Sequence, residues 1–318
     1  MGTQHVNATR AGTLIITGLC LSLSINCGKS QPATAEASAP LTDPPKAAEP
    51  KSNESRSVES SVQAEIGRMD AERRTKLLAD AQSALDETRN AIKALDHGDK
   101  RAAEAALERA TGKLDLIVAR DRALALAPVG VATIIHDLYT TVDAVKATVK
   151  LAKDHLADGQ VQQARDLLAG LASEADIQVS NLPLATYPAA IKAVVPLIDA
   201  GKVEEAEAAL FAALHTLVVE DYIIPLPRVR AQSMLREAQK LAEKSNRTTD
   251  ENDRLRGLIS AAQNEVKLAE VLGYGTKDSY KPLYEQIADI QKQTEAGQTG
   301  RGLFDKLQDS LKRFKFRG

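Results

Sequence analysis

The sequence predicts an all-α protein, an irregular bundle of helical hairpins, interrupted by two segments that would form one short two-stranded β pair. From Val62 onward, apolar residues recur at spacings of three and four, which is the period of an amphipathic helix. Glycines separate the helical stretches. Two Pro-punctuated, β-branched segments, at about 177–182 and 217–224, break the helical period. Together these observations predict the fold class.

The N-terminal 61 residues are predicted to lie outside the folded core. Residues 1–26 are typical of an export signal, in which Arg10 precedes an uncharged apolar run from Ala11 to Ile25. That run is shorter than the about 20 residues that a bilayer span needs. Residues 27–61 are rich in Pro, Ala, Ser and Glu, so a disordered tether is expected there. We therefore expect a protein of the periplasm or cell envelope.

Two kinds of processing are compatible with this N-terminus. In one, Cys27 becomes a lipidated N-terminus, because it directly follows the apolar run, although Asn26 stands where a small residue is expected. In the other, cleavage follows Ala35 or Ala39, after small-residue sites that lie further along the chain. A third interpretation is that the apolar run is not cleaved and serves as an anchor. The only other cysteine is Cys20, so the folded part has no disulfide, thiolate zinc site or Cys nucleophile.

Residues 62–293 are predicted to form the helical domain. Helices are expected over about 77–95, over 103–117, and from Pro128 through Leu156. Around Gly98, Gly159 and Gly201 the same spacing recurs, with Ala five residues later and Leu nine residues later. This pattern indicates either a degenerate hairpin repeat or independent hairpins that share one kind of turn.

The two non-helical segments supply the candidate ligand pocket. They extend over 177–188 and 217–227, and would either pair as strands or pack as extended coil on the bundle. Tyr187, His215 and Tyr222 lie in or beside them and are the candidate pocket residues. The alternative is that these side chains pack in the core, with the hydroxyl groups bonded locally.

The C-terminal part begins with a capping box, Thr248 with Glu251, which predicts a helix ending at Gly273. A last core helix is expected over 282–293, a linker over 294–302 and a basic amphipathic helix over 303–318. One face of this tail suits an anionic membrane surface. Docking on the bundle and a frayed end are the alternatives. The candidate membrane contacts are Leu303, Leu307, Leu311, Phe314, Lys312 and Arg313.

Several blocks of sequence resemble one protein family. They read ATGKLDLIVARD (110–121), NLPLATYPAAIKAVVPLID (181–199), LVVEDYIIPLPRVRAQ (217–232) and LAEVLGYGTKDSYKPLYEQI (268–287). In this order they are similar to the YfdX family, over roughly residues 75 to 290. The resemblance implies a mostly helical, exported bacterial protein linked to acid and drug stress. It implies no catalytic residues.

Composition and motifs exclude several classes of function. Lys and Arg total 41 against 43 Asp and Glu, and aromatics are 3%, which disfavours nucleic-acid binding. The sequence has no phosphate loop, dinucleotide fingerprint or HExxH pattern, so we expect no cofactor and no metal. The leading hypothesis is a non-enzymatic envelope stress protein that binds a small molecule or a protein partner, with homo-oligomerisation left open. The alternatives are a helical scaffold and a hydrolase that uses His136 or His215.

Overall fold

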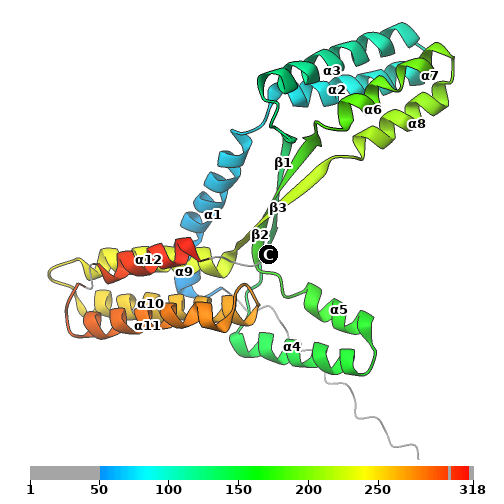
Figure 1. Ribbon diagram of the computed structural model, residues 1–318. Helices are drawn as coiled ribbons and strands as arrows, with labels where there is room; N and C mark the ends of the chain where they lie inside the picture. Colours follow the sequence, from blue (N-terminus) through cyan, green and yellow to red (C-terminus); the bar gives the residue numbers. More distant parts are fainter. Residues whose placement is uncertain (1–50, 300–301, 315–318) are drawn as a thin grey trace, which may run out of the picture. The chain divides into compact units, whose positions relative to one another are not determined.

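The computed structural model describes residues 51–299 and 302–314, which form helices around one small sheet (Figure 1). The described residues are mostly helical, as the sequence predicted. The predicted signal, Cys27 and the tether up to residue 50 lie outside them.

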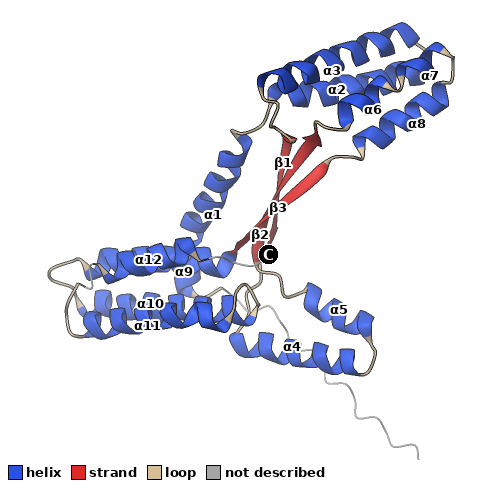
Figure 2. Cartoon of the chain, in the orientation of Figure 1, coloured by secondary structure: helices blue, strands red, loops and turns tan. Residues whose placement is uncertain are grey.

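The sheet has three antiparallel strands, β1 (Leu126–His136), β2 (Glu174–Pro183) and β3 (Val218–Pro225), in the order β1-β2-β3 (Figure 2). The predicted β pair corresponds to β2 and β3, where Ile177 stands opposite Tyr222. This part of the prediction is confirmed. Because β2 is the central strand, its backbone hydrogen-bonding groups are paired on both sides.

The predicted helix from Pro128 to Leu156 is wrong in its first part, because these residues form strand β1. Residues 126–136 pair with β2 from Leu126↔Pro183 to His136↔Glu174, and the helix starts only at Val142. The segment contains Val129, Val131, Ile134 and Ile135, whose branched side chains suit a strand. Pro128 is accommodated because it lies on an edge strand beside a register shift.

The first core is formed by helices that flank one end of the sheet. They are α2 (Ala79–Asp96), α3 (Lys100–Arg120), α6 (Tyr187–Lys192), α7 (Val195–Asp199) and α8 (Val203–Leu214). Small side chains such as Ala84, Ala103 and Ala106 are fully or almost fully buried here and let α2 and α3 approach closely. From the sheet, Ala127 of β1 and Leu182 of β2 join this core.

The second core is formed by helices from both ends of the described chain. They are α1 (Asn53–Arg74), α9 (Leu226–Ala242), α10 (Thr249–Val271), α11 (Lys277–Glu295) and α12 (Leu303–Arg313). Ala175 and Ile177 of β2 belong to this core. Strand β2 therefore contributes side chains to both cores: its first residues pack in the second core and its last residues pack in the first core.

Helices α4 (Val142–Ala157) and α5 (Val161–Ala169) form a hairpin whose residues belong to neither core. Helix α4 contacts α10. The hairpin leaves Leu156, Val161 and Leu168 exposed.

The predicted glycine turns are confirmed at all three positions. Gly98, Gly159 and Gly201 have φ of 71°, 72° and 73°, in the left-handed region that glycine adopts without a steric penalty. At each, the amide after the glycine donates to a carbonyl five residues back, as in Gln160 to His155 at 2.8 Å. The repeat is incomplete, however, because Leu168 is 45% exposed in the α4–α5 hairpin.

Two predicted boundaries are wrong. Helix α1 starts at Asn53, so residues 53–61 are helical and not part of a tether. Ser52 caps this helix, and Val58, Val62 and Ile66 of α1 pack in the second core. Helix α11 extends from Lys277 to Glu295, with Pro282 inside it, so the predicted linker begins two residues too early.

The capping box at Thr248 is present in full, since Glu251 N–H donates to Thr248 Oγ1 at 3.2 Å and Thr248 N–H donates to Glu251 Oε2 at 3.0 Å. We expect Thr248→Ala to lower the free energy of unfolding by about 1 kcal/mol. The matched control is Thr276→Ala, because Thr276 is the N-cap of α11 but makes no side-chain cap bond. Urea unfolding followed by circular dichroism measures both, and equal losses would contradict the assignment.

Candidate functional site

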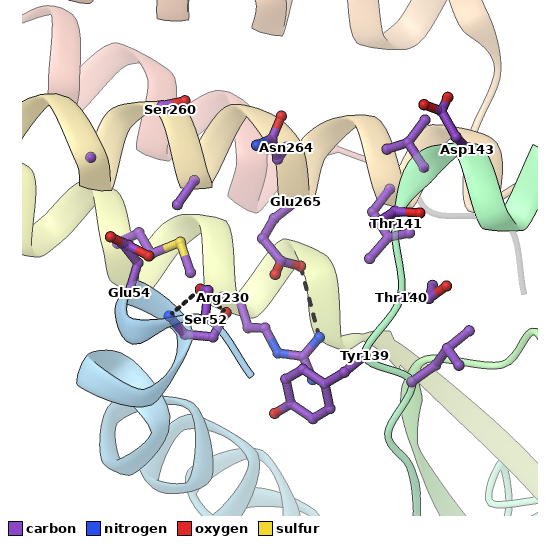
Figure 3. Close-up of a pocket in the computed structure, with 17 residues that line it drawn as sticks. Ser52, Glu54, Tyr139, Thr140, Thr141, Asp143, Arg230, Ser260, Asn264 and Glu265 are labelled. Carbon is purple, nitrogen blue, oxygen red and sulfur yellow. Dashed lines mark hydrogen bonds and ion pairs between the residues drawn. The ribbon is translucent and has the colours of Figure 1, made fainter. Parts of the chain in front are cut away.

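A cavity of about 590 Å³ lies between the start of α1, the loop after β1, and helices α9 and α10 (Figure 3). Its wall mixes polar and apolar side chains, the latter including Leu138, Val142 and Met234. The residues that carry its chemistry are Ser52, Glu54, Thr140, Asp143, Arg230, Ser260, Asn264 and Glu265.

Arg230 is the central charged residue of this cavity. It lies on α9 and is only 2% exposed, so its charge needs partners inside the protein. Its guanidinium donates to the carboxylate of Asp137, which follows β1, and lies 3.8 Å from Glu265 on α10. The guanidinium carbon lies 4.4 Å from the centre of the Tyr139 ring, a cation–π distance. Figure 3 shows Arg230 and Glu265 pointing toward one another.

Lys51 forms a second cationic contact next to this cluster. Its ammonium group lies 3.0 Å from Glu59 and 4.5 Å from the centre of the Tyr139 ring. The Tyr139 hydroxyl donates to Glu59 at 3.3 Å. The Tyr139 ring therefore makes cation–π contacts with two cations, Lys51 and Arg230.

Glu265 has an unusual protonation equilibrium. Burial raises its pKa to about 7, although the positive charge of Arg230 opposes this rise, and Asp137 adds to it by repulsion. Both carboxylate neighbours also keep the pKa of Arg230 raised, against the effect of its own burial. Glu265 is therefore the group in this cavity that changes charge near neutral pH.

Three buried polar atoms of the cavity wall have no hydrogen-bond partner within the described chain. They are Thr140 Oγ1, and Arg230 Nη1 and Glu265 Oε2, which lie 3.8 Å apart as an ion pair but are too far apart for a hydrogen bond. Such atoms are uncommon in folded proteins, because leaving one unpaired costs roughly 1–3 kcal/mol. They come from α9, α10 and the loop after β1. They supply a donor, an acceptor and a hydroxyl, which suits a small molecule with complementary polar groups.

The raised pKa of Glu265 makes folding depend on pH. Between about 4.5 and about 7 the folded protein holds a proton that the unfolded chain has lost, so stability falls as pH rises through this range. We expect a loss of about 3 kcal/mol, and Glu265→Gln should abolish it. Melting curves from about pH 5 to about pH 8 measure this.

The control for this prediction is Glu87→Gln. Its carboxylate accepts a hydrogen bond from Arg109, which lowers its pKa, so its contribution is lost below about pH 4.5. The variant should keep the wild-type slope from about pH 5 to about pH 8. A Glu265→Gln variant with an unchanged slope would show that Glu265 does not titrate there.

The structure does not assemble the predicted pocket of Tyr187, His215 and Tyr222. Tyr187 is fully buried in the first core, and its hydroxyl donates to Thr88 at 3.0 Å. His215 caps α8 in an exposed position, and its Nδ1 lies 2.7 Å from the carbonyl oxygen of Phe211. Tyr222 is 39% exposed on β3 and stacks against Arg73 of α1. The prediction is wrong because antiparallel pairing places Tyr222 opposite Ile177, near the start of β2, whereas Tyr187 follows the end of β2.

The predicted membrane-contacting face of the tail is buried against the protein itself. Leu307 and Leu311 are at most 1% exposed, and Leu303 and Phe314 pack against the second core. Helix α12 contacts α9 and α11. Lys312 lies 3.8 Å from Asp309, and the Arg313 side chain donates to the backbone carbonyl of Asp309 at 3.3 Å. The docking alternative therefore describes this structure.

The sequence did not single out Arg230, Asp137 or Glu265, the charged residues at the centre of the candidate site. Arg230 lies in a helix that is buried on nearly every side from Leu226 to Leu235. The same stretch contains Arg228, Gln232 and Ser233, so its sequence does not mark Arg230 as a buried charge that needs partners. Its partners, Asp137 and Glu265, are far away in sequence, so the pairing itself could not be predicted.

Metal-binding clusters and membrane-spanning helices are both absent from the described residues. Within 51–299 and 302–314, no His, Cys, Asp and Glu side chains gather in a group of three that could hold a metal ion. In the same ranges, no helix has the length and apolar character needed to cross a membrane.

Comparisons with known proteins point to one family. A solved structure of YfdX from Salmonella Typhi matches with 15% identity over 47% of this chain and 93% of that chain. Its TM-score of 0.32 is too low to support an argument about fold. None of the curated proteins compared with the chain matches it. The model of the YfdX protein matches residues 84–223, a range that includes Asp137 and Tyr139 but ends before Arg230 and Glu265. Residues 84–223 of this chain are therefore similar to the YfdX family.

Proposed function

We propose that this protein is an exported bacterial stress protein of the YfdX type that binds a small polar molecule without transforming it. The observation that carries the proposal is a group of three polar atoms on the cavity wall that accept or donate no hydrogen bond within the described chain: Thr140 Oγ1, and Arg230 Nη1 and Glu265 Oε2, which are joined only by an ion pair of 3.8 Å. A ligand that offers an acceptor to Arg230 and a donor to Glu265 would satisfy them. Amino acids and other small zwitterions have this combination of groups.

A binding role, and not catalysis, is supported by where the histidines lie. The hydrolase hypothesis requires His136 or His215 as a general base, but both side chains are exposed and neither lines the cavity. Arg230 remains protonated at any physiological pH, so it positions a ligand and does not transfer protons. We therefore assign the cavity to recognition.

An envelope location and a link to acid stress are part of this proposal. The signal-like N-terminus supports export, and the titration of Glu265 near neutral pH supports a site whose charge changes on acidification. Cell fractionation with an antibody to the folded domain tests the location. Full-length protein that starts at Met1 in the cytoplasm would refute export, and mass spectrometry of the mature N-terminus would detect lipidated Cys27.

The binding proposal is tested by melting-temperature shifts with a panel of free amino acids, small zwitterions and polyols. We expect at least one zwitterion to stabilise the wild type, and Thr140→Val and Ala261→Met to reduce the shift. Both substitutions alter the cavity wall without removing a charge. The matched control is Thr216→Val, which lies outside this cavity. If no compound shifts the wild type, or if both cavity variants respond as the wild type does, the cavity is not a ligand site.

A scaffold role is the second candidate, and the exposed apolar side chains of the α4–α5 hairpin favour it. Leu156, Val161 and Leu168 are 48%, 55% and 45% exposed. A second copy of the chain would cover them. Sedimentation of the wild type and of a triple Ser variant at these positions tests this, because an oligomer that the variant abolishes would support assembly through the hairpin.

A further inference from the structure

A second concave surface, separate in chemistry from the Arg230 cavity, is lined by residues of α4, α10 and α11. It encloses about 720 Å³, and we call it the lysine groove. Its lining consists of Val142, Lys146, Val149, Lys150, Lys153, Lys267, Glu270, Val271, Gly275, Lys277 and Tyr284. Three helices therefore direct lysines to one groove.

The groove has a strong excess of positive charge. Five lysines line it, against the single carboxylate of Glu270. That carboxylate accepts a hydrogen bond from the Tyr284 hydroxyl, which partly occupies it. Lys146 lies 3.9 Å from Asp143, while the other four lysines have no carboxylate within ion-pair distance among the described residues. The lysines repel one another. An anion bound in the groove would be attracted by several of them at once and would offset this repulsion.

The arrangement of the lysines follows from the helical period. Lys146, Lys150 and Lys153 are spaced by four and three residues, so they form one stripe along α4. Lys267 lies on α10, and Lys277 is the first residue of α11. Lysines are compact point charges on flexible stems, so they suit a phosphate group, which carries close to two negative charges.

The groove also has an apolar wall. Val142, Val149 and Val271 are all partly buried side chains of this lining, and the ring of Tyr284 adds to them. An inorganic anion would leave this wall in contact with water. A molecule that has an apolar chain beside its anionic group would cover it and gain from the burial.

We propose that the lysine groove binds a single amphiphilic molecule that carries a phosphate monoester, as a phosphatidic-acid-type lipid does. The phosphate lies among the lysines of α4, α10 and α11, and the start of the acyl chain lies along Val142, Val149 and Val271. This site shares Val142 with the Arg230 cavity but none of its charged residues, and binding here does not require that the cavity holds a ligand.

The test measures binding of dihexanoyl phosphatidic acid below its micelle concentration by calorimetry on the full chain. Inorganic phosphate and dihexanoyl phosphatidylcholine are the comparison probes. We expect the phosphatidic acid to bind about tenfold more tightly than either, with affinity that falls as salt is added. Equal affinity for inorganic phosphate would overturn the amphiphile assignment, and equal affinity for phosphatidylcholine would overturn the role of the lysines.

Matched charge reversals locate the site. Lys150→Glu with Lys267→Glu should weaken binding of phosphatidic acid by about tenfold or more. The control is Lys281→Glu with Lys292→Glu, two exposed lysines that do not line the groove, with the same change in net charge. Equal losses in both pairs would mean non-specific attraction and would overturn the proposal. If the first pair does not fold, Lys150→Gln with Lys267→Gln repeats the test, and unaltered affinity there would also overturn it.

Discussion

Replacing Arg230 with Met should lower the free energy of unfolding by about 3–5 kcal/mol. The side chain is 2% exposed and serves two carboxylates, those of Asp137 and Glu265. Methionine fills much of the same space, so the loss comes mainly from the carboxylates left without their cation. Denaturant unfolding at pH 8, where Glu265 is mostly ionised, measures the full effect.

The control for Arg230 is Arg89→Met. Arg89 pairs with Asp86 on the surface of α2, where both side chains are more than half exposed, so the loss should stay below about 1 kcal/mol. Acidification should also shrink the Arg230→Met effect, because protonated Glu265 no longer needs a cation. An Arg230→Met variant as stable as the control would refute the central role of the Arg230 cluster.

Replacing Phe304 with Ala should cost about 3–5 kcal/mol as well, because it opens a cavity in the second core. Phe304 is 0% exposed and belongs to α12. The sequence predicted that the apolar face of this helix could contact a membrane. The expected loss depends on docking of this helix against α9 and α11. Thermal unfolding of the full chain in the absence of lipid measures it.

Phe211→Ala is the matched control for Phe304. Phe211 lies on α8 and is 50% exposed, so the same change in chemistry should cost much less. If Phe304→Ala melts at the wild-type temperature while the wild type sediments with anionic vesicles, α12 binds lipid and does not dock on the bundle. Loss of stability in Phe304→Ala alone supports the docked helix.

Local features of this chain could be predicted from sequence because short-range physics decides them. The turns at Gly98, Gly159 and Gly201 need a left-handed residue, and glycine adopts that conformation without a steric penalty. The capping box of Thr248 and Glu251 involves residues three apart. Even the pairing of β2 with β3 was foreseeable, since prolines and branched side chains excluded a helix from both segments.

Strand β1 shows where local pattern fails. Residues 128–142 place apolar side chains at helical spacing, and their branched residues also suit a strand. The choice is made by β2, which lies about forty or more residues further along the chain and supplies the hydrogen-bond partners. Leu168 shows the same limit, because the hairpin repeat predicts burial and the structure leaves the side chain exposed.

Sequence alone was enough to predict the helical class, the glycine-closed hairpins, the cap at Thr248 and the resemblance to the YfdX family. Only the tertiary structure decided which side chains are buried and which charges meet. It placed Tyr187 in a core, docked the face of α12 on the bundle, and brought Arg230 to Asp137 and Glu265. The reason is physical: backbone conformation responds mainly to neighbours in sequence, whereas burial and ion pairing depend on groups that folding brings together from distant positions.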